Sequence, residues 1–298
     1  MTLPNLSAPS AAAGIGSQIN KVVRGFWNRR TPWLDRFSIV LVGVMVAMAV
    51  LGPLFLQHDP YQANSKEALL PPSPSHWMGT DDVGRDVLSR LVVGAGQTIF
   101  AAALIVLLAT VVGILVASIA AVSTKWIDET IMRACDIFMS LPSLVLALGI
   151  AAALGSSMTS IIIAMVGALW PSTARLARGI IRETMTSTYT EAARILGVSK
   201  PRLLLKHVLP NSLDAIYVHA SMEVSGTIVM MSGLAFLGVG APPPSADWGS
   251  MIAQGKDYIT SAWWVALFPG IGITLGAIAF GLLGDAVRNY VDPTTRRS

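Results

Sequence analysis

The chain has few charged residues and a single cysteine for its length of 298 residues. Charged residues make up 13% of the sequence, roughly half the share of an average soluble domain. Cys135 has no cysteine partner, which excludes an internal disulfide, and its apolar neighbours favour a small core residue over a reactive thiol. Because hydrophobic residues reach 53%, this scarcity of charge places the chain among membrane proteins.

Motifs that carry common enzyme chemistry are also absent from the sequence. There is no GxxxxGK[ST] phosphate loop, so the chain cannot hydrolyse ATP by that route. HExxH, GxSxG and a Cys/His cluster are missing, and the four histidines are scattered. No basic, aromatic-interleaved patch accompanies the net charge of +4, which argues against binding to nucleic acid. We therefore expect neither a catalytic residue nor a metal or cofactor bound by this chain.

Six mostly apolar segments follow one another along the chain. Each is close to the roughly 20 residues that a helix needs to cross a bilayer. They are residues 37–55, 98–121, 134–154, 160–177, 215–238 and 265–283. The sequence therefore predicts an all-α polytopic membrane protein with six transmembrane helices.

Lys and Arg residues are distributed unevenly among the loops between these segments. The first, third and fifth loops (residues 56–97, 155–159 and 239–264) hold only four of the 21. Positively charged loops remain in the cytoplasm, so the distribution predicts that both termini are cytoplasmic. The first residues lack the charged start and apolar centre of a secretory signal, and we expect a cytoplasmic tail there. The predicted organisation is an N-terminal tail (1–36), a first helix with its outer loop (37–97), a core (98–284) and a C-terminal tail (285–298).

A polar stretch, residues 189–211, separates the fourth and fifth apolar segments. It begins with strong helix formers and has Glu191 in the first turn, where the helix dipole favours an acid. Gly197 suits the left-handed residue that follows a helix end, and the Ser-Lys-Pro sequence after it can start a second, basic helix. We expect Pro210 to end that helix. The pattern predicts a helix–Gly–helix elbow with its second arm at the membrane surface; a simple surface loop is the competing interpretation.

The residues of this elbow resemble the EAA loop of ABC-importer permeases, which docks on the ATP-hydrolysing subunit. The residues that carry this resemblance, and that we expect to couple the chain to an ATPase, are Glu191, Ala192, Ala193, Gly197, Leu209 and Pro210. Other segments from residue 33 onward look like the C-type subunit of the dipeptide/oligopeptide/nickel branch, including HWMGTD (76–81), GRD (84–86) and FLGVG (236–240). The Gly-Gln-Thr at 96–98 stands where that branch usually has an arginine-containing run.

This resemblance implies the type I importer permease fold and a permease subunit of the bacterial inner membrane. Such a subunit forms a translocation pathway with a second, homologous permease within the lipid bilayer. It couples to two ATP-binding subunits, which carry ATP and Mg²⁺, and receives its cargo from an extracytoplasmic solute-binding protein. Peptides are the commonest cargo of similar families, while nickel complexes and glutathione use the same permease type. The sequence does not name the cargo.

Two other classes of membrane protein compete with this interpretation. An ion-gradient-driven secondary transporter or channel predicts inverted repeats, broken helices and several acids near the bilayer midplane. The sequence shows no convincing internal repeat and only Glu223 as such an acid. A membrane-anchored interaction protein would need neither a transport pathway nor the elbow.

Few ionisable residues lie within the apolar segments, and each is costly there. His219 and Glu223 are four residues apart and therefore share one face of the fifth segment, which must face protein or a watery path. They are candidates for lining the pathway, with hydrogen bonding to a neighbouring helix as the alternative. We expect Asp136 to pair with Arg133, and Pro142 to permit a kink in the third segment.

The first and last outer loops carry four further candidates, Arg85, Asp86, Arg90 and Trp248. The first three lie on the polar face of a predicted amphipathic helix that starts at residue 83 or 84. One interpretation is that they form ion pairs that brace the outer mouth or meet a binding protein. The alternative, which exposed charges usually favour, is a solvated helix face. Trp248 belongs to a group of aromatic residues placed as at a membrane interface.

Overall fold

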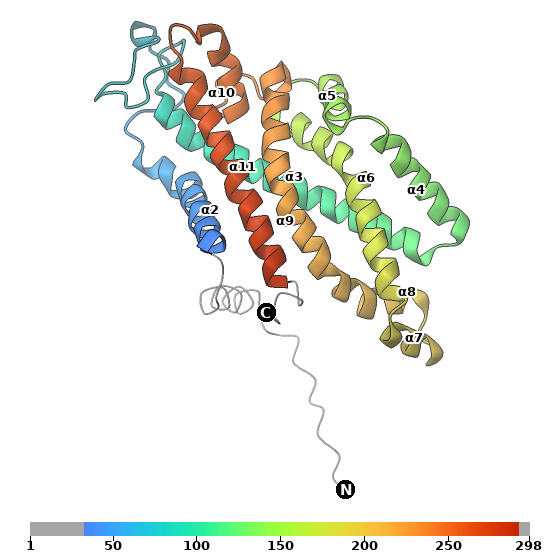
Figure 1. Ribbon diagram of the computed structural model, residues 1–298. Helices are drawn as coiled ribbons and strands as arrows, with labels where there is room; N and C mark the ends of the chain where they lie inside the picture. The colour runs from blue at the N-terminus through green and yellow to red at the C-terminus, as the bar shows by residue number, and fades with distance from the viewer. Residues whose placement is uncertain (1–32, 292–298) are drawn as a thin grey trace.

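The computed structural model describes residues 33–291, which form helices joined by turns and loops (Figure 1). No β-strand occurs among these described residues. The predicted N-terminal tail (residues 1–36) and C-terminal tail (residues 285–298) lie partly outside them. Where the structure does describe the predicted tails, residues 33–36 and 285–291 belong to helices.

Five helical stretches between residues 33 and 291 are long and apolar enough to cross a membrane. The first is α2 (Trp33–Leu51), which continues through a short 3₁₀ turn, η1 (Gly52–Phe55). The others are α3 (Val87–Val122), α6 (Met158–Met185), the stretch Lys200–Val239 and α11 (Trp264–Val291). A helix is the expected conformation because it satisfies every backbone polar group within the segment, where a bilayer offers no other partner.

The third predicted segment is broken rather than continuous. It corresponds to α4 (Lys125–Met139) and α5 (Ser143–Leu154), which are bent by 86° relative to each other. Pro142 is the N-cap residue of α5. Proline has no N–H with which to continue the preceding helix, and it disfavours a helical conformation at the residue before it. The predicted kink is thus a complete break, and six membrane segments result when this bent pair is taken as one crossing.

The central helix of the described chain is α3. It packs against α2, α6, α9 (Leu209–Leu234) and α11, and in Figure 1 it crosses behind the last three. Small buried residues such as Ala102, Gly113 and Ala117 allow this close approach. At Gly113, for example, an added Cβ would lie 2.8 Å from the side chain of Thr173 in α6.

The helices form a bundle with two different ends (Figure 1). One end, which we call the loop end, holds residues 56–86 and 240–263, including the short helix α10 (Trp248–Gly255). The opposite end, which we call the elbow end, holds the start of α2, the end of α11 and the helices α7 (Thr188–Ile195) and α8 (Lys200–Leu203). The two groups of candidate residues outside the membrane segments therefore lie at opposite ends.

Large apolar side chains remain exposed along the sides of this bundle. Examples from five helices are Val44, Leu107, Ile137, Val145 and Leu267, each at least 47% exposed. Soluble proteins rarely expose contiguous apolar surface of such extent. A bilayer or a neighbouring membrane subunit would cover it.

Candidate functional site

The elbow (residues 189–211) contains two short helices around a glycine. The first, α7, carries Glu191 in its first turn. Gly197 follows α7 with a φ of +82°, the left-handed conformation that stops a helix, and its N–H donates to the Arg194 carbonyl at 3.0 Å. Ser199 is the N-cap residue of α8. The predicted helix–Gly–helix geometry is confirmed.

Pro210 does not end the second arm of the elbow, contrary to the prediction. A π-helical turn, Leu204–Val208, connects α8 directly to α9, so residues 200–239 form one helical stretch. The Leu209 N–H donates to the Leu204 carbonyl, five residues back, and Pro210 falls in the first turn of α9. In a π-helical turn each backbone N–H bonds to the carbonyl five residues back instead of four. This change in hydrogen-bond register comes directly before Pro210, which has no N–H, and the helix therefore continues through the proline. The second arm is the start of the fifth membrane segment and not a separate surface helix.

The base of the elbow is packed into the bundle. Three elbow residues join an apolar cluster with α3, α6 and α9, which consists of Ala117, Ala177, Ile181, Leu203, Leu204, Val208 and Ile216. Burial of one such Leu or Val side chain contributes about 1.5–3 kcal/mol. The buried hydroxyl of Thr190 donates to the carbonyl of Met185, the last residue of α6, at 2.9 Å. The elbow is thus attached to both α6 and α9.

The tip of the elbow is exposed. Ile195 is 81% exposed and Leu196 is 83% exposed, and Glu191, Ala192 and Gly197 are exposed beside them. Single apolar side chains in water are common, but two adjacent ones at the tip of a polar projection have the composition of a contact surface. Glu191, Ala192 and Gly197 of the EAA-like pattern therefore lie at a potential docking point, whereas Ala193 and Leu209 pack against the buried cluster at the base.

A buried carboxylate connects α4 to α6 near the elbow end. Asp128 is 3% exposed and accepts hydrogen bonds from Arg178, at 2.5 Å, and from Arg182. The two arginines are four residues apart and so share one face of α6. The sequence contains that spacing, but the acceptor lies 50 residues before Arg178, so no local pattern identifies it.

Asp136 does not pair with Arg133, contrary to the expectation. Its carboxylate contacts the guanidinium of Arg175 in α6, while Arg133 pairs with Glu129 at 3.1 Å, one turn earlier in α4. The reason is that α4 packs against α6, which brings Arg175 to Asp136.

His219 and Glu223 meet on α9 as their spacing predicts. The distance between His219 Nε2 and Glu223 Oε1 is 3.7 Å. Their side chains are 24% and 36% exposed, so the pair lies at the surface of this subunit and not within its core. Among the described residues, His219 Nε2 is a buried atom without a hydrogen-bond partner. The other, partly exposed atoms of the two side chains are open to a neighbouring subunit or a watery path.

At the loop end, the predicted amphipathic helix starts later than expected. Val87 is the first residue of α3, and Asp86 is the N-cap residue, whose carboxylate accepts from the Ser89 N–H at 2.8 Å. The Asp81 carboxylate accepts instead from the backbone N–H and the Nε of Arg85, at 2.9 and 2.7 Å. A turn closed by Asp81 thus precedes the helix.

Arg85 and Arg90 belong to the interior of the loop end, so the interpretation as a solvated face is wrong. Arg90 is 1% exposed. Its guanidinium donates to three backbone carbonyls, those of Pro60, Pro244 and Ser245, at 3.3, 3.3 and 2.8 Å. Both arginines also donate to Oε1 of Gln254, at 3.1 Å from Arg85 and 3.3 Å from Arg90. These bonds brace the first loop against the last one.

Trp248 is fully buried and does not lie at a membrane interface, contrary to the expectation. Its indole Nε1 donates to the carbonyl of Leu91 in α3 at 2.9 Å. Its ring lies against Gly272 and Gly276 of α11, where an added Cβ would be 3.1 and 3.4 Å from the indole. Trp248 therefore fixes α10 between α3 and α11.

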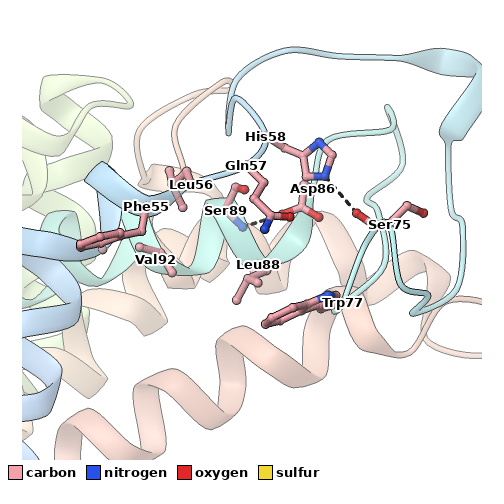
Figure 2. A pocket seen from close by; sticks show the side chains of 11 residues that line it. Phe55, Leu56, Gln57, His58, Ser75, Trp77, Asp86, Leu88, Ser89 and Val92 are labelled. Atoms are coloured by element: carbon pink, nitrogen blue, oxygen red, sulfur yellow. Dashed lines mark hydrogen bonds between the residues drawn. The ribbon is translucent and has the colours of Figure 1, made fainter.

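A cavity at the loop end brings together residues that the sequence does not connect. Figure 2 shows a neighbouring pocket that His58 and Asp86 also line, with Asp86 bonded to Ser89 and His58 bonded to Ser75. One side-chain N or O atom from each of His58, His76 and Asp86 lies within 4.8 Å of the others. Two of the four histidines, scattered in the sequence, thus become neighbours in the fold. No spacing pattern in the sequence indicates this grouping.

Comparison with known proteins identifies the class of this chain. Residues 109–297 match the family described as binding-protein-dependent transport system inner membrane component. The chain belongs to this family.

It is 41% identical to the "Probable D,D-dipeptide transport system permease protein DdpC" of Escherichia coli (strain K12), over 90% of each chain. It is also 33% identical to the oligopeptide transport system permease protein OppC of Bacillus subtilis (strain 168), over 98% of each chain. A third relative, the glutathione transport system permease protein GsiD of Pectobacterium atrosepticum, is 34% identical over 91% of this chain and 90% of its own.

Membership of the binding-protein-dependent transport family confirms the predicted class and fold. The protein is a multi-pass membrane permease subunit of an ABC transporter with the type I permease fold, and not an enzyme. The relatives give no support to the secondary transporter or channel. The elbow, α9 and α11 lie within the matched residues, whereas the loop-end residues 56–86 precede them.

Proposed function

We propose that this permease subunit imports peptides and that its elbow docks on an ATP-binding subunit. The proposed cargo is supported by relatives, two of which are named for dipeptide and oligopeptide transport. The chemistry of ATP hydrolysis, with ATP and Mg²⁺, belongs to two partner subunits. An extracytoplasmic solute-binding protein delivers the peptide.

A second, homologous permease completes the pathway in this proposal. His219 and Glu223 lie partly exposed on α9. Ionisable groups at membrane depth face protein or water because lipid contact is costly. We therefore assign the α9 face that carries this pair to the second permease or to the peptide path between the two permeases.

The elbow end lies in the cytoplasm and the loop end outside in this proposal. Basic residues of the elbow end include Arg182, Arg194, Lys200, Arg202, Lys206 and Arg288. The loop end has three, and Arg90 adjoins them in the first turn of α3. Because Arg85 and Arg90 are buried, only Lys66 and Lys256 are exposed there. This difference supports the orientation, because positively charged loops remain cytoplasmic. The bacterial inner membrane is the location that fits.

The observation that carries the proposal is the contrast between the exposed tip and the buried base of the elbow. The tip presents Ile195 and Leu196, which a pocket on the ATP-binding subunit can cover. The base, through Leu203, Leu204 and Val208, packs against the membrane helices. Because the two parts are only a few residues apart, a displacement of the tip by ATP binding moves α6 and α9.

The test is whether the ATP-binding subunits co-purify with permease variants at the tip. Leu196→Asp places a charge where an apolar contact is proposed, and we expect it to abolish co-purification. Leu196→Met keeps an apolar side chain at the same exposed position and should retain the ATP-binding subunits. Membrane insertion of each variant is measured separately. Equal recovery of the ATP-binding subunits with both variants would reject this docking point.

A further inference from the structure

We propose that His58, His76 and Asp86 form a binding site for a divalent transition-metal ion at the loop end. One side-chain N or O atom of each residue lies within 4.8 Å of the other two, and His76 Nδ1 is 3.0 Å from Asp86 Oδ1. A Zn²⁺ ion sits about 2.0–2.2 Å from N and O ligands, which places neighbouring ligand atoms roughly 3–3.6 Å apart. The pair His76 Nδ1–Asp86 Oδ1 already has that spacing. The ring of His58 lies 4.6 Å from the ring of His76, centroid to centroid, at an interplanar angle of 33°, so His58 has to rotate to direct a nitrogen at the same ion.

The donor set determines which metals fit. Imidazole suits zinc, nickel and copper, whereas magnesium and calcium prefer oxygen ligands alone. Two imidazoles and one carboxylate make three protein ligands, which leaves a fourth position for water or another small ligand. We therefore assign the site to Zn²⁺ or a similar divalent ion and use Zn²⁺ as the probe.

Each proposed ligand is already oriented by a second contact. His58 Nε2 donates to the Ser75 carbonyl at 2.9 Å, which fixes the ring orientation and, in the neutral imidazole, the lone pair on Nδ1. Asp86 Oδ2 accepts from a backbone N–H of α3 at 2.8 Å, so Oδ1 points toward the histidines. His76 Nε2 lies 3.8 Å from the Glu67 carboxylate. Outer contacts of this kind hold imidazole and carboxylate ligands in place in metal sites.

The site is accessible from solvent. Both histidines and Asp86 line a cavity of about 210 Å³, together with polar residues that include Glu67, Gln62 and Asn64. A hydrated ion can enter such a polar space. When a metal ion takes His76 Nδ1 in place of the hydrogen bond to Asp86 Oδ1, the single proton of the neutral imidazole is held on Nε2, on the side of the Glu67 carboxylate.

A bound ion would join three parts of the loop end. His58 follows η1, at the end of the first membrane segment, and His76 lies within the first loop. Asp86 is the N-cap residue of α3, so it fixes the start of the central helix. The ion would therefore fasten the first loop between the first membrane segment and α3. This inference does not depend on the identity of the cargo or on the docking of the elbow.

The test measures zinc binding to the purified complex, isolated with a tag that contains no histidine. Zn²⁺ is titrated against a chromophoric chelator, and the metal content is measured by mass spectrometry after dialysis. The wild-type complex should bind one more Zn²⁺ ion than the complex that contains His58→Ala. The difference isolates this site from metal bound by the partner subunits. Zn²⁺ should also raise the unfolding temperature of wild type and not that of His58→Ala.

Two further variants complete this experiment. His207→Ala removes an exposed histidine of the elbow and should keep the zinc equivalent that His58→Ala loses. Asp86→Asn keeps a good helix cap but removes the anionic ligand, so it should lower zinc affinity even where His58→Ala fails to assemble. Co²⁺ bound to wild type should show the intense visible absorption of a four-coordinate site. Equal zinc content in wild type, His58→Ala and Asp86→Asn would overturn the proposal.

Discussion

Substitution of Gly197 tests whether docking depends on the backbone conformation of the elbow, independently of the side-chain contacts that its tip makes. Gly197 has a φ of +82°, and an added Cβ would meet no atom of the described chain within 4 Å. A side chain at this position therefore adds backbone strain and no clash within the subunit. For alanine the left-handed conformation costs about 1–2 kcal/mol. Asparagine visits that conformation more readily, so its cost should be smaller.

This strain should weaken docking of the ATP-binding subunit. If residue 197 leaves the left-handed conformation to relieve the strain, α8 turns relative to α7. Docking then requires the left-handed conformation again, so the strain energy is subtracted from the binding free energy. A cost of about 1–2 kcal/mol corresponds to a roughly 5- to 30-fold weaker affinity for Gly197→Ala. Gly197→Asn should bind more tightly than Gly197→Ala, although asparagine has the larger side chain.

The assay is a titration of the reconstituted permease pair with purified ATP-binding subunits, which gives a Kd for each variant. The order wild type, Gly197→Asn, Gly197→Ala, from tightest to weakest, is the expected result. If Gly197→Asn binds more weakly than Gly197→Ala, the added side chain clashes with the partner and the backbone argument is wrong. Wild-type affinity in both variants would refute the requirement for a left-handed residue.

Three further predictions concern the loop end, the pathway and the topology. Arg90→Ala should destabilise the protein by about 1–3 kcal/mol for each buried carbonyl left without its donor, and thermal unfolding of the complex measures this against the exposed-charge control Lys66→Ala. A melting temperature equal to that of the control would contradict the bracing role. Glu223→Leu should reduce ATP-dependent transport without changing subunit stoichiometry; normal transport would remove the pair from the pathway. A cysteine at Asn64 should react with an impermeant maleimide in intact cells, and a cysteine at Ser199 only after permeabilisation. Labelling at Ser199 in intact cells would reverse the proposed orientation.

The elbow could be predicted from the sequence because its signals act on neighbouring residues. Gly197 stops α7 through its left-handed conformation, and α8 begins after Ser199, whose carbonyl accepts from the Leu203 N–H, so both signals act within a few positions. The prediction that Pro210 ends a helix is wrong because the effect of a proline depends on the hydrogen-bond register around it. The π-helical turn before Pro210 changes that register, and its residues carry no signal that distinguishes it from an ordinary helical turn.

The loop end could not be predicted because its partners are far apart in the chain. Arg90 resembles a residue on a polar helix face, yet one of its acceptors, Pro244, lies 154 positions later. The indole of Trp248 bonds to Leu91, 157 positions earlier. A helical pattern describes only the helix that contains it, so it cannot show that a loop covers the charged face.

The broken third segment illustrates a different limit. Residues 134–154 are apolar enough for one span, and hydropathy alone does not distinguish a kinked helix from two helices bent by 86°. Pro142 marks the position of the change in direction, but its size depends on how α4 and α5 each pack against α6.

We propose that this permease subunit imports peptides and that ATP hydrolysis reaches the membrane helices through the elbow. The most direct measurement is uptake of labelled di- and oligopeptides into proteoliposomes that contain the complete complex, with ATP enclosed and the binding protein outside. We expect ATP-dependent uptake by wild type and Leu196→Met, and none by Leu196→Asp inserted to the same level. Peptide uptake without ATP, or equal uptake by all three proteins, would contradict it.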